Sequence, residues 1–196
     1  MSAALKHPPA CMTLDEFLAW DAGGDAGQQR WQLVDGEPVA MAPGSDNHNM
    51  IQAELARLIG NHLAERGGPC RVGTEPGVVP RVRASENWRT PDLGVTCMPP
   101  GGGLGLPAPV LLVEILSPSN HAETRANIWA YTTIPSVQEI LVVNSTRIEA
   151  ELLRRRDDGS WPEQPETIPA EGTLGLAGIG FATPLAALYR TTSLAR

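Results

Sequence analysis

The sequence predicts one domain of the α/β class, on the border with α+β, built on a mixed central sheet. Three observations support this prediction. Residues 48–66 carry apolar side chains at helical spacing, residues 110–116 are an almost continuous apolar run, and residues 137–145 carry the apolar run ILVV of a second buried strand. Such runs are typical of strands buried on both faces. The segment between them, 122–134, has an amphipathic helical pattern, which favours a β-α-β crossover between parallel strands.

The length of 196 residues fits a single domain, and 42% hydrophobic residues are enough for one core. We expect residues 1–12 to form a flexible leader, residues 13–190 to form the domain, and residues 191–196 to form a tail. The 20 glycines and 18 prolines predict many loops and turns between the regular elements.

The N-terminal part of the domain predicts a helix followed by a β-hairpin. A short helix begins near Thr13, whose side chain can cap it in a capping box with Glu16. Residues 31–43 alternate between apolar and polar side chains on both sides of Asp35-Gly36, a strong turn dipeptide. We therefore expect two antiparallel strands joined at this dipeptide.

The remaining elements are a long helix and several strands. Ser45 or Asp46 can cap the helix over 48–66. Residues 70–84 suggest one or two edge strands interrupted by prolines. Residues 91–98 predict a short strand, and residues 147–161 predict a strand that runs into an Asp-Gly turn.

The charge balance bears on the class of partner. The formal net charge is −7, whereas proteins that bind nucleic acid without sequence preference usually carry a basic surface. The balance therefore argues against a strong non-specific DNA binder. It does not exclude a nuclease, because bound metal ions would supply positive charge locally.

The sequence also bears on the compartment. No apolar run is long enough to span a bilayer, and the first residues lack the apolar segment of a secretory signal. Cys11, Cys70 and Cys97 are odd in number and have no CxxC spacing. We therefore expect buried, reduced thiols in a cytoplasmic protein.

An acidic residue inside an apolar strand is the feature that points to chemistry. Glu114 lies in the run LLVEILS, and burying an unpaired carboxylate is very costly. A cationic partner, a raised pKa or a metal ion must compensate. Asp92 follows Pro91 at the start of a neighbouring predicted strand. Two carboxylates that converge at strand ends form a hard-oxygen site suited to Mg²⁺ or Mn²⁺, whereas the alternative for each is a structural ion pair or hydrogen bond.

Several motifs together resemble a known family. The chain carries TPDLGV, then VEILSPSN, then a helix that contains WAY, then IPSVQEILVV. This order is similar to the Uma family of "putative restriction endonucleases", which belongs to the PD-(D/E)XK nuclease superfamily. The hairpin LVDGEPVAMAP with the histidine after it adds to the resemblance, which covers roughly residues 12–190. It implies a restriction-endonuclease-like fold, in which helices flank a mixed sheet, and DNA as the substrate.

The resemblance also implies roles for individual residues. Asp92 matches the aspartate of the PD motif, and Glu114 matches the acidic residue of the second half-motif; both are the expected metal ligands. Glu37 matches a glutamate common in the hairpin, although a simple turn charge is the alternative. His48 matches a histidine at the start of the next helix, where it could contact substrate or only cap and pack.

The chain departs from the family pattern at the lysine. The superfamily position two residues after the glutamate is Leu116, and alignment from the tyrosine of WAY places Asn127 at the lysine position on the helix. Lys6 is the only lysine in the chain. Arg125 is the nearest cationic substitute and could hold a phosphate, but an exposed helix charge is its alternative. It cannot accept a proton, so the site either works without a lysine, or is weak, or is degenerate.

Arginines close to Asp92 are candidates for phosphate contacts. Arg81 and Arg83 would share one face of a strand, and Arg89 follows shortly after them. They could grip a nucleic-acid backbone, or they could belong to a solvated edge strand. We expect Trp129 to pack the crossover helix on the sheet.

Two hypotheses follow from the sequence. The first is a Mg²⁺- or Mn²⁺-dependent endonuclease that hydrolyses phosphodiester bonds of DNA, with Asp92 and Glu114 on the metal and Glu37, Arg125 and Asn127 assisting. The second is a nuclease-fold protein without catalysis that binds nucleic acid or protein. A homodimer suits the first hypothesis, because cutting both strands of a duplex favours two-fold symmetry.

Overall fold

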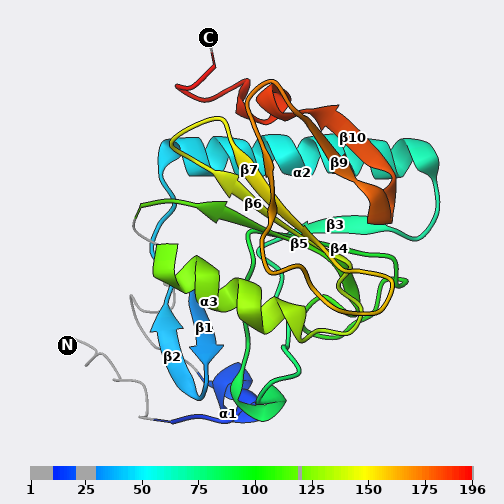
Figure 1. The fold of residues 1–196 in the computed structure, drawn as a ribbon. Helices are drawn as coiled ribbons and strands as arrows, with labels where there is room; N and C mark the ends of the chain where they lie inside the picture. Colours follow the sequence, from blue (N-terminus) through cyan, green and yellow to red (C-terminus); the bar gives the residue numbers. More distant parts are fainter. Residues whose placement is uncertain (1–10, 21–29, 119–120, 196) are drawn as a thin grey trace.

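A six-stranded mixed sheet forms the centre of the computed structural model, which describes residues 11–20, 30–118 and 121–195 (Figure 1). The strand order is β3-β4-β5-β6-β7-β8. The elements in chain order are α1 (Leu14–Ala19), β1 (Trp31–Val34), β2 (Glu37–Ala40), α2 (Asp46–Arg66), β3 (Arg71–Thr74), η2 (Ala84–Glu86), β4 (Leu93–Thr96), β5 (Pro109–Leu116), α3 (His121–Thr132), β6 (Glu139–Asn144), β7 (Ala150–Arg154), β8 (Glu166–Ile168), β9 (Thr173–Leu176), η3 (Ala177–Ile179), β10 (Phe181–Pro184) and η4 (Leu185–Tyr189). The α/β class predicted from the sequence is confirmed.

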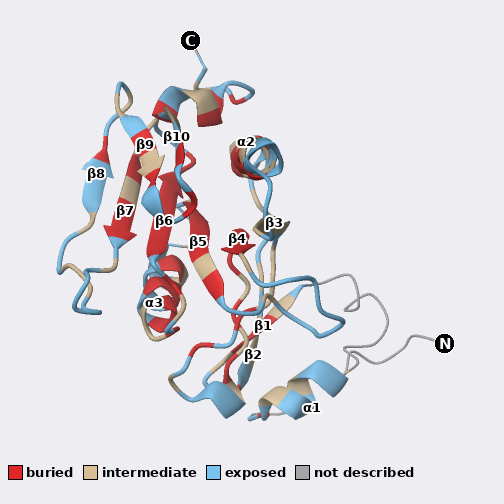
Figure 2. Ribbon diagram, turned by 90° about the vertical axis from the view of Figure 1, so that its right-hand side faces the viewer, coloured by how far each residue is buried: buried red, intermediate tan, exposed pale blue. Residues whose placement is uncertain are grey.

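The strands β5 and β6 pair in parallel, and all other neighbours in this sheet are antiparallel. The helix α3 connects β5 to β6, as expected for a crossover between parallel strands. The two central strands are buried almost throughout, because α2 covers one face of the sheet and α3 covers the other (Figure 2). This double cover explains why both strands consist mostly of apolar residues.

The two faces of the sheet have separate cores. On the α2 face, side chains of the helix pack against alternate residues of β5, and the small hairpin β9–β10 joins the same core. On the α3 face, Leu112 and Leu116 of β5 pack with Ile128 and Tyr131 of α3. Side chains alternate between faces along a strand. Glu114 therefore projects toward α3, between the two leucines.

Two expectations differ from the structure, and one hairpin was not expected. Trp129 is 60% exposed, because Ile128 and Tyr131 occupy the face of α3 that meets the sheet and Trp129 lies about 100° around the helix from Ile128. Arg81 and Arg83 do not share a strand face: a bend and the short helix η2 occupy this segment, with Arg83 in the left-handed region at φ 44°. The hairpin β9–β10 was not predicted, since glycines obscure its alternation.

The chain ends near the predicted domain boundaries are partly packed. Most of the expected leader, including Lys6, lies outside the described residues. So do residues 21–29, whose composition predicts a loop, and residues 119–120, which end the SPSN sequence that predicts a cap for the next helix. Met12 is 4% exposed, and its N–H donates to the carbonyl of Gly36 at 2.7 Å. Near the other end, the Ser193 N–H donates to Asn47 Oδ1 at 3.1 Å. In the described part of the chain, no helix has both the length and the apolar composition that crossing a bilayer requires.

The packing of α3 can be tested with two neighbouring residues. Replacing Ile128 by Ala should lower the free energy of unfolding by about 2–4 kcal/mol, because it leaves a cavity between α3 and the sheet. Replacing Trp129 by Ala should change the same quantity by no more than about 0.5 kcal/mol. Urea unfolding followed by circular dichroism measures both values. A larger loss for Trp129→Ala would show that α3 is rotated relative to this description.

Candidate functional site

Asp92 is held by contacts to two elements. It directly precedes β4, and its Oδ2 accepts a hydrogen bond from the Ile115 N–H of β5 at 2.5 Å. Its Oδ1 lies 3.0 Å from Nε2 of His48, which belongs to the first turn of α2. The Ser45 hydroxyl caps this turn by accepting the His48 N–H at 3.3 Å. The start of α2 therefore delivers the imidazole to the Asp92 carboxylate.

Glu114 is held from the α3 side. Its side chain is 5% exposed, and its Oε1 accepts a hydrogen bond from the Tyr131 hydroxyl at 2.6 Å. The Asn127 side-chain N–H donates to the same oxygen at 3.2 Å. Asn127 and Tyr131 are four residues apart and so share one face of α3. Because both hydrogen bonds are made to Oε1, neither occupies Oε2.

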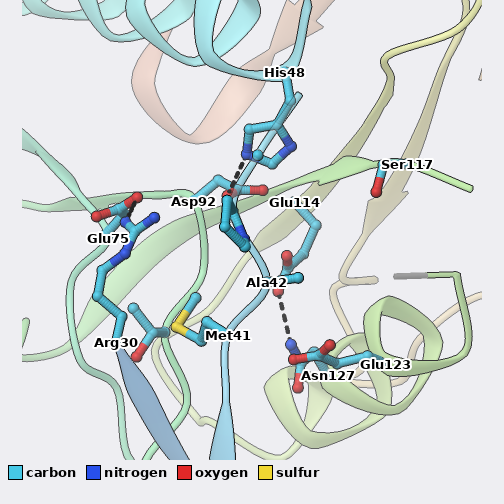
Figure 3. A pocket seen from close by; sticks show the side chains of 13 residues that line it. Arg30, Met41, Ala42, His48, Glu75, Asp92, Glu114, Ser117, Glu123 and Asn127 are labelled. Atoms are coloured by element: carbon cyan, nitrogen blue, oxygen red, sulfur yellow. Dashed lines mark hydrogen bonds and ion pairs between the residues drawn. The ribbon is translucent and has the colours of Figure 1, made fainter. Parts of the chain in front are cut away.

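The two carboxylates line one pocket (Figure 3). Of the residues singled out from the sequence, this pocket brings together Asp92, Glu114, His48 and Asn127. The residue before β1, the loop after β2 and the residue after β3 supply another part of the lining. The complete lining consists of Arg30, Met41, Ala42, Pro43, Gly44, His48, Glu75, Thr90, Asp92, Glu114, Ser117, Glu123 and Asn127.

The electrostatics of the pocket are dominated by crowded acids. Burial raises the pKa of Glu114 well above its usual value, and the charge of Asp92 raises it further, whereas the hydrogen bonds from Tyr131 and Asn127 lower it. Burial also raises the pKa of Glu123, with Arg89 lowering it and Asp92 raising it. A positive charge placed between these carboxylates would lower the pKa of both Glu114 and Glu123.

Several residues proposed from the sequence lie elsewhere. Glu37 is exposed at the start of β2 and does not line the pocket. Arg83 is exposed and lies 3.9 Å from Asp35. Arg125 does not line the pocket, and it donates two hydrogen bonds to Glu151, at 2.9 and 3.1 Å. Arg89 is 6% exposed and donates to Asn127 Oδ1 at 3.0 Å, so it lies behind the pocket wall.

Comparison with known proteins supports the resemblance in the sequence. A family model described as "Uma2: Putative restriction endonuclease" matches residues 14–184. The chain belongs to the Uma2 family. The uncharacterized protein slr1290 of Synechocystis is 32% identical over 193 residues, which cover 95% of this chain and 97% of that protein. The uncharacterized protein sll1609 of the same organism is 25% identical over 155 residues, covering 76% and 84%.

A solved structure has a similar fold. It is described as a putative nuclease belonging to DUF820 from Anabaena variabilis, and it superimposes with a TM-score of 0.72 at 18% identity. The alignment covers 91% of this chain and 97% of that one. At this identity the likeness bears on the fold. It confirms that this Uma2 protein has a nuclease-like arrangement of sheet and helices.

The structure of this Uma2 protein shows contacts to pocket residues that the sequence analysis missed. Gln32 of β1 is fully buried, and its amide donates to the Glu123 carboxylate. The only sign of this contact in the sequence was a polar residue among the apolar residues of the first hairpin strand. Arg30 pairs with Glu75 at the pocket rim. Nothing in the spacing of these two residues could have indicated that pair, since they come from different elements.

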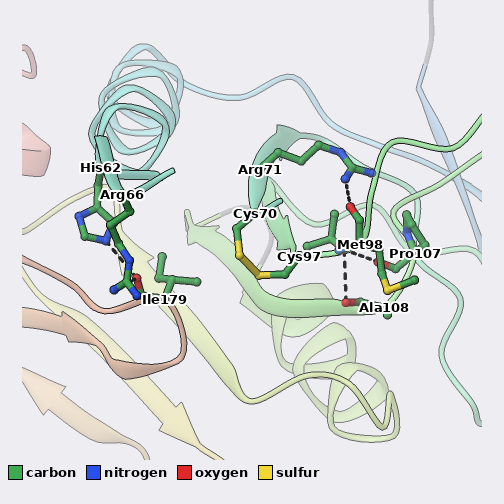
Figure 4. Close-up of a disulfide and its surroundings, with 10 residues drawn as sticks. His62, Arg66, Cys70, Arg71, Cys97, Met98, Pro107, Ala108 and Ile179 are labelled. Atoms are coloured by element: carbon green, nitrogen blue, oxygen red, sulfur yellow. Dashed lines mark hydrogen bonds between the residues drawn. A yellow bond between two sulfur atoms is a disulfide. The ribbon is translucent and has the colours of Figure 1, made fainter. Parts of the chain in front are cut away.

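A disulfide closes the segment that carries part of the site (Figure 4). In the β3–β4 register Arg71 lies opposite Thr96, so the next residues outward, Cys70 and Cys97, face each other and are bonded. The expectation of buried, reduced thiols is therefore wrong for both. It is wrong for Cys11 in a different way, because this free cysteine is exposed. The 27-residue separation of the bonded cysteines spans the segment that carries Asp92.

The donor chemistry of the pocket fits a hard divalent cation. Carboxylate oxygens are the ligands that Mg²⁺ and Mn²⁺ prefer, and Mg²⁺ is often bound by one or two carboxylates while it keeps several waters. Asp92 and Glu114 are such a pair. No closed cage exists, since the described residues contain no group of three or more His, Cys, Asp or Glu side chains arranged to hold a metal ion.

The raised pKa of Glu114 predicts a pH-dependent stability of the metal-free protein. The folded state holds this proton more tightly than the unfolded chain, whose glutamates titrate near 4.5. The free energy of unfolding should therefore fall as pH rises from about 4.5 through the raised folded value. Glu114→Gln should remove this contribution, so the variant gains stability relative to the natural protein as pH rises.

Chemical unfolding between pH 4 and pH 9 with a chelator present measures this difference. Glu163→Gln is the control, because Glu163 is exposed and distant from the pocket lining. It should follow the natural protein at every pH. A constant difference between Glu114→Gln and the natural protein across this range would contradict the electrostatic description of the site.

Proposed function

We propose that this Uma2 protein is a divalent-metal-dependent endonuclease that hydrolyses phosphodiester bonds of DNA. One observation supports it above all: Asp92 and Glu114, from different strands, line one pocket. Membership of a family described as "Putative restriction endonuclease" supports a nucleic acid as substrate. Restriction-endonuclease-like proteins generally use divalent metals, and the acidic pocket has matching chemistry.

Asp92 and Glu114 would hold the cation, with Mg²⁺ or Mn²⁺ as the proposed ion. When bound, such an ion neutralises charge on a phosphodiester and lowers the pKa of a coordinated water. The protein's own contribution is orientation. His48 fixes the Asp92 carboxylate at 3.0 Å, and Tyr131 and Asn127 fix that of Glu114 at 2.6 and 3.2 Å.

The proposed DNA contact is at the outer rim of the pocket. Among the described residues that line it, Arg30 is the only lysine or arginine, and it is half exposed beside Glu75. A phosphate group could take the place of Glu75 as its partner. The sequence predicted that Arg83 and Arg89 contact the phosphate backbone of a nucleic acid. Arg89 is buried, however, and cannot reach substrate without a rearrangement.

A second candidate function follows from the lysine positions. Leu116 and Asn127 stand where the family pattern has lysine, and no lysine occurs among the residues that line the pocket. A nuclease-fold protein that binds nucleic acid or protein without cutting would also retain the acidic pair. Metal binding and cleavage separate the two functions.

We propose a homodimer as the working assembly and the cytoplasm as the compartment. Two symmetry-related pockets would face the two strands of a duplex. Disulfides are rare in the reducing cytoplasm, so in that compartment Cys70 and Cys97 are expected as two thiols rather than as the bonded pair. Sedimentation with and without a DNA duplex measures the assembly directly.

The enzyme hypothesis predicts metal binding and metal-dependent cleavage together. The purified protein should bind Mn²⁺ in a calorimetric titration and nick supercoiled plasmid DNA only when Mg²⁺ or Mn²⁺ is present. Asp92→Ala and Glu114→Gln should each reduce nicking by about 100-fold or more, because each removes an oxygen that stabilises charge at the reaction centre. Glu114→Gln should remain folded, since an amide can still accept the hydrogen bonds of Tyr131 and Asn127.

Glu163→Gln serves as the control and should bind Mn²⁺ and nick like the natural protein. Mn²⁺ binding that disappears in Asp92→Ala, together with nicking, supports the enzyme. DNA binding without metal binding or cleavage supports the second function. Unfolding of Glu114→Gln would show that the carboxylate has a structural role.

A further inference from the structure

Arg89 is a buried cation close to the pocket. It lies next to Val78 in an isolated β-bridge, with backbone hydrogen bonds of 2.8 and 2.9 Å in the two directions. Only 6% of the residue is exposed. Its Nε donates to Asn87 Oδ1 at 3.2 Å, and its Nη1 donates to Asn127 Oδ1 at 3.0 Å. Within the described residues it forms no ion pair with a carboxylate.

Burying a guanidinium without a paired carboxylate requires compensation. Burial lowers the pKa of Arg89, and electrostatic interactions with Tyr131, Asp35, Glu123 and Glu114 raise it. Arginine nevertheless stays protonated at neutral pH. The cost of burying this charge is therefore offset by the acids of the pocket and by two amide oxygens, rather than by one partner.

The hydrogen bonds fix the orientation of Asn127. A guanidinium can only donate, so the Asn127 oxygen must face Arg89. The amide nitrogen then faces Glu114, whose carboxylate can only accept while ionised. A chain of two hydrogen bonds thus runs from the Arg89 charge through Asn127 to Glu114 Oε1. Figure 3 shows Asn127 directed at Glu114 from α3.

We propose that Arg89 is the positioning cation of this site: through Asn127 it orients the Glu114 carboxylate and supplies the positive charge that no lysine provides. Arg125 does not fill this role, because it pairs with Glu151 outside the pocket. Arg89 does not line the pocket, so it acts through Asn127 and not on substrate. The effect on cleavage rests on the proposed function, whereas the charge arrangement is independent of it.

Moving the charge from Arg89 to position 127 tests the proposal. Four proteins are compared: the natural chain, Arg89→Gln, Asn127→Lys, and the double variant. Arg89→Gln leaves Glu114 without its distant cation, and Asn127→Lys places a second cation beside Arg89 in a buried site, so each should lower Tm. In the double variant the lysine stands in for the arginine. Its Tm should exceed the value expected from adding the single changes by about 2–4 °C or more.

Cleavage gives the second readout. Arg89→Gln should reduce plasmid nicking by about tenfold or more, a size common for residues that orient ligands of a metal site, and the double variant should recover most of that loss. Mn²⁺ binding should persist in Arg89→Gln, since Asp92 and Glu114 remain. If Arg89 had only a structural role, the Arg89→Gln protein would lose stability and cleavage together. Adding Asn127→Lys would then restore neither.

Arg154→Gln is the matched control. It removes an arginine that donates to buried Glu139 at 2.9 Å and to the Gly175 carbonyl at 3.0 Å, neither of which belongs to α3 or lines the pocket. Its Tm change should add to that of Asn127→Lys without any excess. If Arg89→Gln does not fold, recovery of folding in the double variant supports the proposal. An Asn127→Lys protein that is as stable as the natural chain overturns the proposal.

The outcomes separate this inference from the proposed function. If the Tm changes are non-additive and the protein never nicks DNA, the role of Arg89 as a positioning cation is supported and the endonuclease function is rejected. Additive Tm values, or nicking by Arg89→Gln at the natural rate, would overturn the role of Arg89 whatever the activity of the protein.

Discussion

The Glu114 carboxylate, placed in the middle of a strand buried on both faces, is the constraint on which the rest of the site depends. Alternation along β5 directs it toward α3, where leucines lie on either side of it. A carboxylate there is stable only if polar groups meet it, and α3 presents Asn127 and Tyr131 one turn apart for this purpose. Asp92 then adds a second negative charge from the edge of the neighbouring strand, which makes the pocket receptive to a cation.

The elements that carry this arrangement were largely predictable. Continuous apolar runs and one amphipathic segment indicated the parallel pair β5–β6 with α3 between them. The Asp-Gly dipeptide indicated the first hairpin. The exposure of Trp129 and the conformation at Arg83 were not predictable in the same way. An aromatic residue or an arginine can lie on either the buried or the exposed face of an element, and the packing of neighbouring residues determines which.

For the site itself, sequence indicated the residues but not their contacts. Asp92 and Glu114 stood out because their surroundings were apolar or strand-like. The bond from Arg89 to Asn127 joins a segment beside the first hairpin to the crossover helix, and no local pattern connects two such positions. The Cys70–Cys97 bond depends in the same way on the register of β3 with β4, which only the folded chain reveals. Long-range pairs of this kind explain why the sequence analysis favoured Arg125, which pairs with Glu151 and does not line the pocket.

The acidic charge of the pocket is balanced by groups close to it rather than by the charge of the chain as a whole. The chain as a whole is acidic, with a net charge of −7, and its pocket is also acidic. One buried guanidinium behind the wall offsets part of this charge, and a divalent ion between the carboxylates would offset more. The same ion would make the pocket attractive to a phosphodiester, which a surface of net negative charge otherwise repels.

The most direct test of this description is the position of Mn²⁺ in crystals grown or soaked with the ion, located by its anomalous scattering. We predict one strong peak within bonding distance of carboxylate oxygens from both Asp92 and Glu114. A peak bound elsewhere, or a pocket in which the two side chains bond only His48, Tyr131 and Asn127 at saturating Mn²⁺, would contradict the shared metal site.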